Sequence, residues 1–93
     1  MEISKDACVI NDIGLDDLFG KTQENEVVET RKAVSWIAKK KLGVSLSEIG
    51  RITNRNHATI LYHIRFIDER LDQLNHYPNI KRVIDCITLN LVQ

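Results

Sequence analysis

The chain has 93 residues, a formal net charge of zero and 43% hydrophobic residues, so we expect one folded domain over residues 1–93. One proline and four glycines exclude a disordered or fibrous chain. No apolar run approaches the roughly 18 residues that a membrane-spanning helix needs, and the mixed charges of residues 1–6 indicate no signal peptide.

The first predicted element is a helix over residues 3–13, in which apolar side chains recur at helical spacing before a glycine. A short helical turn over residues 15–19 and a polar loop over 21–25 follow. The next helix covers residues 26–42, because acidic side chains crowd its first turns and lysines its last, which suits the helix dipole. Gly43 stands where a left-handed cap would end it. Its apolar stripe consists of Val27, Val34, Ile37, Ala38 and Leu42, with Trp36 at one flank.

The following segment has the layout of a helix-turn-helix. Ser45 and Glu48 have the spacing of a capping box, which predicts that a helix begins at Ser45. Residues 53–55 form the turn, and Asn56 is a favourable N-cap for a third helix that runs to about Leu74. The apolar stripe of this third helix is Ile60, Ile64, Ile67 and Leu71.

A last helix begins at Ile80, and few alternating segments compete, so the predicted fold is all-α with about five to six helices. The two cysteines, Cys8 and Cys86, are far apart and belong to no CxxC or Cys/His cluster. We therefore expect reduced, largely buried thiols, with no disulfide and no metal site. His63 and His76 are expected on the surface.

The zero net charge hides an uneven distribution. Residues 1–30 hold eight acidic and two basic residues, a net charge of −6, whereas residues 31–67 hold eight basic residues and one acidic residue, a net charge of +7. Residues 68–93 carry −1. Because local charge sets the field that a polyanion meets, the predicted helix-turn-helix is the part suited to nucleic acid. A basic surface that is merely solvated is the alternative.

Residues 31–71 resemble the C-terminal DNA-binding domain of the bacterial chromosomal replication initiator, DnaA. That family typically reads Ser-Leu-Pro-Glu-Ile-Gly-Arg, then Arg-Asp-His-Thr-Thr-Val, where this chain has residues 45–51 and 55–60. The segment 14–19 also looks like the family's approach to its basic loop. The resemblance implies a helix-turn-helix that binds double-stranded DNA, with residues 56–59 in the major groove.

Three departures from the family pattern change what the resemblance implies. In that family a basic loop also places an arginine in the minor groove. The loop over residues 21–31 has Gln23, Glu24 and Glu26 where the family has bases, and only Lys21 and Arg31 keep the charge, so this contact is expected to be lost or much reduced. Asn56 replaces an aspartate, which favours adenine N6 and N7 over cytosine N4. Ala58 replaces a threonine, which leaves contact with a thymine methyl.

The outward face of the third helix supplies the candidate site. With Ile60 at the centre of the inner face, steps of about 100° place Ala58, Tyr62 and Arg65 on the opposite side. The predicted base contacts are Asn56, His57, Ala58 and Thr59. The predicted phosphate contacts are Arg31, Lys40, Lys41, Arg51, Arg55, Tyr62 and Arg65. The competing interpretations are that Asn56 acts only as an N-cap and that His57 is a surface residue or packs on the turn.

Two hypotheses remain for function. The first is a sequence-preferring DNA-binding protein of the bacterial cytosol or nucleoid, acting as a small transcriptional regulator or an accessory factor of replication or a mobile element. The second is a protein-interaction module with no DNA binding, in which Tyr62 and Phe66 anchor the partner. A weaker similarity to the Trp repressor, which has Ala-Thr-Ile at a similar point, leaves open a homodimer. No phosphate-binding loop or catalytic motif occurs, so we expect neither an enzyme nor a cofactor.

Overall fold

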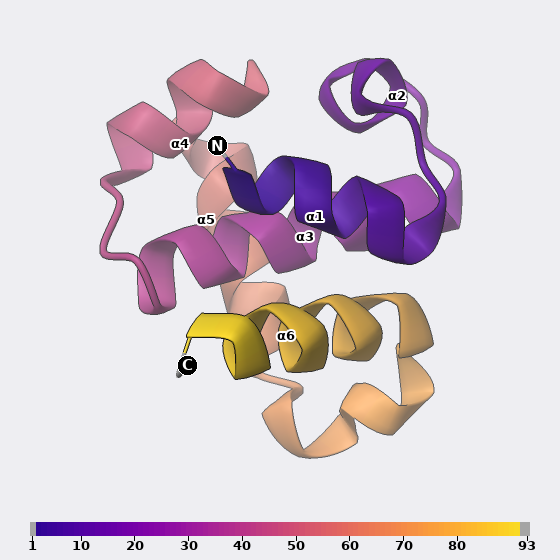
Figure 1. Cartoon of the computed structure of the whole chain (residues 1–93). Helices are drawn as coiled ribbons and strands as arrows, with labels where there is room; N and C mark the ends of the chain where they lie inside the picture. The colour runs from indigo at the N-terminus through magenta and orange to yellow at the C-terminus, as the bar shows by residue number, and fades with distance from the viewer. Residues whose placement is uncertain (1, 92–93) are drawn as a thin grey trace.

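The computed structural model describes residues 2–91, and the side chains of residues 2–89 within them. Six α-helices and one 3₁₀-helix follow one another along this part of the chain, without a strand (Figure 1). They are α1 (Glu2–Asn11), α2 (Leu15–Phe19), α3 (Asn25–Lys40), α4 (Leu46–Thr53), α5 (His57–Asp68), η1 (Leu71–His76) and α6 (Pro78–Leu91). The all-α prediction is therefore confirmed. None of the helices in the described part has both the length and the apolar character needed to span a bilayer.

The central helix of the fold is α3, which packs against α5, α6 and α1. In Figure 1, α1 and α6 lie on the near side of α3, and α5 passes behind it. Ile37 of α3, Ile60 of α5 and Val83 of α6 are fully buried in one shared apolar cluster. Ile49 also joins this cluster, so the same core holds α4 beside the start of α5.

α3 ends in a left-handed turn. Gly43 adopts φ +67°, and the backbone N–H of Val44 donates to the Ala38 carbonyl, six residues earlier, at 2.9 Å. The helix stops at Lys40, two residues before the predicted end, because the chain has already turned. Leu42, which was expected in the apolar stripe, is consequently exposed.

Side-chain caps define the two helices of the helix-turn-helix. Ser45 Oγ accepts from the backbone N–H of Glu48 at 3.2 Å, and Asn56 Oδ1 accepts from that of Thr59 at 2.9 Å. Both predicted caps are therefore present, and α4 begins directly after Ser45. Between the helices the chain reverses at Asn54, which takes the left-handed conformation at φ +56°.

The end of α5 differs from the prediction. The helix stops at Asp68 rather than near Leu74, and the chain continues into the 3₁₀-helix. Arg70 has left the helical conformation at φ −126°, and Nη1 of its guanidinium donates to the Phe66 carbonyl at 3.1 Å. Leu71 therefore lies outside the helix and is exposed, not part of its apolar stripe.

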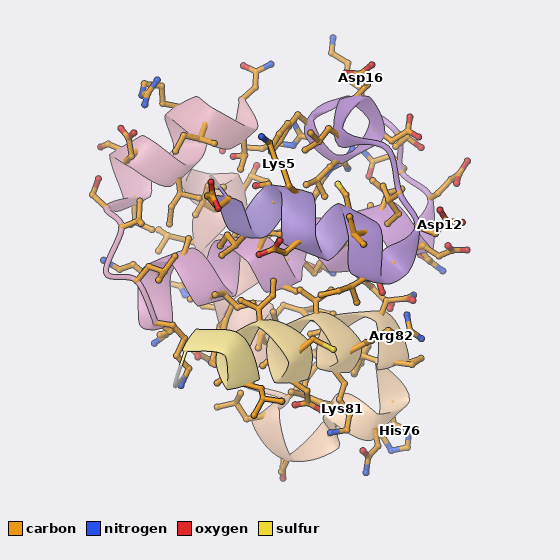
Figure 2. The ribbon with its side chains drawn as sticks, in the orientation of Figure 1. Lys5, Asp12, Asp16, His76, Lys81 and Arg82 are labelled. Carbon is orange, nitrogen blue, oxygen red and sulfur yellow. The ribbon has the colours of Figure 1, made fainter. Side chains whose placement is uncertain are left out.

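A buried asparagine joins three helices at one end of the molecule. Asn11, the last residue of α1, donates from Nδ2 to Thr30 Oγ1 of α3 at 2.8 Å and to the Asn79 carbonyl of α6 at 3.1 Å. Its Oδ1 accepts from Arg82 Nη1 at 2.7 Å. Figure 2 shows Arg82 on the side of the molecule where α1 ends and α6 begins. These bonds fix the first and last helices relative to α3.

The two cysteines have different environments. Cys8 is buried in the apolar cluster, as expected, and burial raises the pKa of its thiol. Cys86 lies on the outward side of α6 and is exposed, so its expected burial is wrong. Both thiols are free.

Candidate nucleic-acid interface

The four predicted base contacts come together at the start of α5. Asn56, His57 and Ala58 are exposed, and Thr59 is half-buried. Asn56 is exposed and uses Oδ1 for its cap, which leaves the amide nitrogen as a donor for another partner. The tip of the helix therefore presents polar and small side chains to solvent, as a helix that enters a groove requires.

The imidazole of His57 turns back toward α4. Its Nε2 lies 3.2 Å from Ser47 Oγ, within hydrogen-bond distance. His57 therefore contacts α4 and not the turn, and its side chain is exposed. Ser47 was not among the candidate residues, and the capping pattern around it gave no signal for this contact.

The outer face of α5 is close to the predicted one. Ile60, Ile64 and Ile67 are buried, while Tyr62 is 57% exposed and Arg65 is exposed. Leu61 is also 37% exposed, and it belongs to the same surface although the sequence analysis did not select it. Its place, about 100° from Ile60 on the helical wheel, is the signal that could have found it.

Arg51 lies on the exposed side of α4 and is paired there with a carboxylate. Its guanidinium makes a two-bonded ion pair with Glu48, one turn earlier, with Nε to Oε2 at 3.1 Å. The hydrogen bond from Arg51 lowers the pKa of the Glu48 carboxyl. The pair is solvated, so Arg51 can exchange this partner for a phosphate at small cost.

Arg55 is half-buried and bonds to backbone instead of standing free. Its guanidinium donates to the carbonyls of Thr53 at 3.1 Å and Asn54 at 3.3 Å, and also to those of Phe19 and Gly20 at the end of α2. The turn of the helix-turn-helix is thereby tied to the loop after α2. Arg55 sits beside the tip but is committed to this structural role.

Arg31 is buried, which corrects its prediction as a phosphate contact. Only 7% of its surface is exposed, and its guanidinium donates to four carbonyl groups around the end of α2. The acceptors are Leu18 at 2.6 Å, Thr22 at 2.7 Å, Asp17 at 2.8 Å and Gly20 at 2.9 Å. A side chain with all these partners inside the protein is not available to DNA in this structure.

Lys40 and Lys41 lie at the opposite end of α5 from its tip. Lys40 Nζ is 3.1 Å from Asp68 Oδ2, and Trp36 Nε1 donates to Asp68 Oδ1 at 2.8 Å. Lys41 lies over the Trp36 ring, 5.6 Å from its centre. Since Asp68 ends the 12-residue helix, roughly 18 Å separate these lysines from the tip along its axis. The structure therefore places them near the end of α5, one turn after Arg65, and away from the tip.

His63 is buried, so its expected surface position is wrong. Burial, and then the nearby charges of Lys32, Arg55 and Arg31, lower its pKa to about 4. Its Nδ1 has no hydrogen-bond partner among the described residues. Lys32 itself is buried under the aromatic side chains of α5, with Nζ 3.6 Å from the centre of the Phe66 ring.

The loop after α2 lies next to the turn, where the DnaA resemblance puts its minor-groove contact. Lys21, Gln23 and Glu24 are exposed on this loop, whereas Glu26 is already in the first turn of α3. The bond from Arg55 to the Gly20 carbonyl sets the loop's position. Lys21, the residue after Gly20, is therefore an exposed cation on the loop that Arg55 joins to the turn, and it was not among the predicted contacts.

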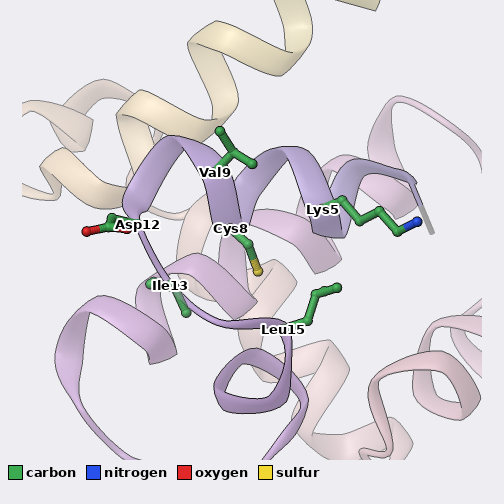
Figure 3. Close-up of a pocket in the computed structure, with 6 residues that line it drawn as sticks. All are labelled: Lys5, Cys8, Val9, Asp12, Ile13 and Leu15. Carbon is green, nitrogen blue, oxygen red and sulfur yellow. The ribbon is translucent and has the colours of Figure 1, made fainter.

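A separate cavity of about 420 Å³ opens between α1 and the start of α2 (Figure 3). It is lined by Lys5, Cys8, Val9, Asp12, Ile13 and Leu15. Cys8 points from α1 toward Leu15, while Val9 points away. None of the candidate nucleic-acid contacts lines it. No group of three metal-binding side chains occurs in the part of the chain that the structure describes.

Comparison with known proteins matches residues 2–67 to the family described as bacterial dnaA protein helix-turn-helix. The chain is 28% identical over 76 residues to the chromosomal replication initiator protein DnaA 1 of Chlamydia trachomatis, covering 82% of this chain and 17% of that protein. It is 29% identical over 86 residues to DnaA of Thermodesulfovibrio yellowstonii, covering 91% and 19%. The chain thus spans less than a fifth of these relatives. No solved structure matches. Since the family model covers more than half of its length, the chain belongs to the bacterial DnaA helix-turn-helix family.

Proposed function

We propose that this chain is a sequence-preferring module that binds double-stranded DNA, with the start of α5 in the major groove. The observation that carries the proposal is the exposed group Asn56, His57 and Ala58 directly after the turn, in a chain of the DnaA helix-turn-helix family. Relatives named as chromosomal replication initiators support the choice of DNA as partner.

Each side chain at the tip has a chemical role in this proposal. The Asn56 amide donates to a base edge, with adenine as the best match because its N7 and N6 suit an amide. Ala58 lets the helix approach closely and contacts a thymine methyl group. Thr59, half-buried, offers its hydroxyl at the border of the contact.

The phosphate contacts are fewer than the charge distribution suggested. Arg51 and Lys21 are exposed on the elements beside the tip, and Arg65 is exposed farther along the outer face of α5, in its last turn. All three can reach the backbone of a duplex, and Tyr62 can add a hydroxyl. The bound Glu48 and the acidic Glu24 weaken the positive field on the same side. Affinity should therefore be modest and strongly dependent on base contacts.

Binding at different salt concentrations tests the proposal. With three cations on phosphates, log K should fall with log salt at a slope of about −3, and Arg65→Ala should reduce that slope by about 1. Lys41→Ala, far from the tip, is the matched control and should leave the slope unchanged. The measurement is fluorescence anisotropy with mixed-sequence duplexes; no binding at low salt would contradict the proposal.

The biological role that we propose is that of a small transcriptional regulator or an accessory factor of replication or a mobile element. The alternative is a protein-interaction module anchored on Tyr62 and Phe66. Phe66 is half-buried between Lys32 and Arg70, whose charged groups lie 3.6 Å and 4.0 Å from the ring centre. Only Tyr62 of these two anchors stands well exposed, so we favour DNA binding.

A further inference from the structure

One edge of the His57 imidazole faces α4, and the other faces away from it. Ser47 Oγ lies 3.2 Å from Nε2, and a Cβ added at Gly50 would lie 3.9 Å from Cδ2. Nε2 and Cδ2 are neighbouring atoms of the ring, so this edge lies along α4. Nδ1 stands on the opposite edge and is the nitrogen left for a partner outside the protein.

We propose that Ser47 is a positioning residue for His57 and, through it, sets the base preference at one position of the DNA site. The inference rests on the proposed function, because it assigns a part of the same interface. The side chain of His57 has two rotatable bonds, and a hydrogen bond from α4 at the end of the ring restricts both. Because α4 and α5 share one core, the ring is then oriented by the body of the domain.

The serine hydroxyl can donate to Nε2 or accept from it, so the direction of this hydrogen bond depends on the tautomer of the His57 ring. When the hydroxyl donates to Nε2, the neutral ring carries its proton on Nδ1, which becomes a donor. Acceptors are the more frequent group on major-groove base edges: purine N7, guanine O6 and thymine O4. With Ser47 as the donor, Nδ1 of His57 is a donor suited to such an acceptor.

The position of Ser47 allows a matched series of variants. It is the second residue of α4, where a backbone N–H has no partner within the helix and proline is tolerated. Proline also occupies this place in the family pattern. Ser47→Ala and Ser47→Pro remove the hydroxyl with opposite effects on the backbone, while Ser47→Thr keeps it. The Ser45 cap on Glu48 is untouched in all three.

The first measurement uses the free protein. Long-range ¹H–¹⁵N spectra of the His57 ring report the proton and the hydrogen bond at each nitrogen separately. We expect a ring protonated mainly on Nδ1 in the wild type and in Ser47→Thr. Ser47→Ala and Ser47→Pro should show a shifted Nε2 signal and a changed tautomer ratio. Identical spectra in all four proteins would overturn the contact on which the inference stands.

The second measurement uses duplexes. A site is selected from random sequence, and each base pair is then replaced in turn. Ser47→Ala and Ser47→Pro should lose about threefold to tenfold discrimination at one base pair, as expected for one hydrogen bond, with the salt slope unchanged. Ser47→Thr should keep it. His57→Ala should lose preference at the same base pair, and adding Ser47→Ala to it should change nothing further.

The outcomes separate the two proposals. If the wild type binds with a preference that Ser47→Ala and Ser47→Pro retain, the positioning role is wrong and DNA binding stands. If neither the wild type nor any variant binds duplex DNA, the proposed function is wrong, and the role of Ser47 in base preference is wrong with it. Urea unfolding of each variant checks that lost discrimination does not come from lost folding.

Discussion

The amide oxygen of Asn56 accepts a hydrogen bond from the backbone of α5, and the amide nitrogen of this exposed side chain remains a donor. The cap and the proposed base contact can be separated, because aspartate caps a helix as well as asparagine but cannot donate. We expect Asn56→Asp to keep the free energy of unfolding and to shift base preference from adenine toward cytosine. Urea unfolding and selection from random duplexes measure the two effects.

Asn56→Ala is the companion variant. It should lower the free energy of unfolding by about 1 kcal/mol, since the Thr59 N–H loses its acceptor, and it should also relax the base preference. If selection with Asn56→Asp recovers the wild-type site, Asn56 is a cap and nothing more.

His63 should make the fold sensitive to mild acid. Its pKa is about 4 in the folded chain, because of burial and the charges of Lys32, Arg55 and Arg31, against an ordinary value of 6.5. The unfolded state therefore binds more protons between these values, so stability is complete above pH 6.5 and is lost as pH falls toward 4. By pH 5 the loss should be about 2 kcal/mol.

Urea unfolding at pH 7 and pH 5 measures this dependence. His63→Leu, which cannot be protonated, should remove most of it, whereas His76→Leu, at an exposed histidine, should not. An equal pH dependence in His63→Leu and the wild type would assign the effect to other groups.

At the scale of elements, helix starts were predictable and helix ends were not. Ser45 and Asn56 cap through atoms three residues away, so the local pattern is sufficient. The end of α5 depends on the hydrogen bond from Arg70 to the Phe66 carbonyl. The Phe66 ring also packs edge-on against Tyr77, which comes later in the chain. Such contacts join residues whose proximity exists only after folding, and periodicity alone continues the helix too far.

Gly50 allows the turn to close against α4. A Cβ there would lie 2.7 Å from the Arg55 carbonyl oxygen, a backbone atom that cannot move without displacing the turn. We expect Gly50→Ala to lower the free energy of unfolding by about 1–3 kcal/mol, despite alanine's better helix propensity. It should also weaken DNA binding, because the same displacement moves Asn56 and His57. Thermal unfolding and anisotropy measure both.

Gly43→Ala is the contrasting variant. Gly43 has nothing within 4 Å of an added Cβ but has φ +67°, so only conformational strain opposes the change. The expected cost is about 1 kcal/mol, with DNA binding retained. If Gly50→Ala proves no worse than Gly43→Ala in both measurements, close packing at the turn is not the constraint.

At the scale of the whole molecule, the excess of basic residues in 31–67 does not become one basic face. Arg31 is buried, Arg55 holds backbone, and Lys40 lies on Asp68 at the far end of α5. The sequence gives the position of each charged residue along the chain, but it does not give the position that the end of a long side chain takes in the folded protein. The tip residues 56–59 could be predicted because helix periodicity and the cap place them directly. Ser47 could not be predicted, because tertiary packing brings it to His57.

Arg31 of α3 connects the acidic first third of the chain to the central helix. The hydrogen bonds that its guanidinium donates explain how the short helix α2 is stabilised. A helix of five residues is unstable alone. Here the carbonyls of Asp17, Leu18 and Gly20 all accept from the Arg31 guanidinium inside the protein. An ammonium group has a compact charge and no fork of donors, so lysine cannot serve these acceptors together.

Arg31→Lys should therefore release α2 while keeping the formal charge. We expect a loss of about 3 kcal/mol in the free energy of unfolding, and faster amide hydrogen exchange in residues 15–20 than in α5. Arg65→Lys, at an exposed arginine, is the control and should stay within about 0.5 kcal/mol of the wild type. Because Arg55 also binds the Gly20 carbonyl, the freed loop should loosen the turn and weaken DNA binding as well. Unchanged exchange in α2 would show that Leu18, fully buried, holds this segment without the arginine.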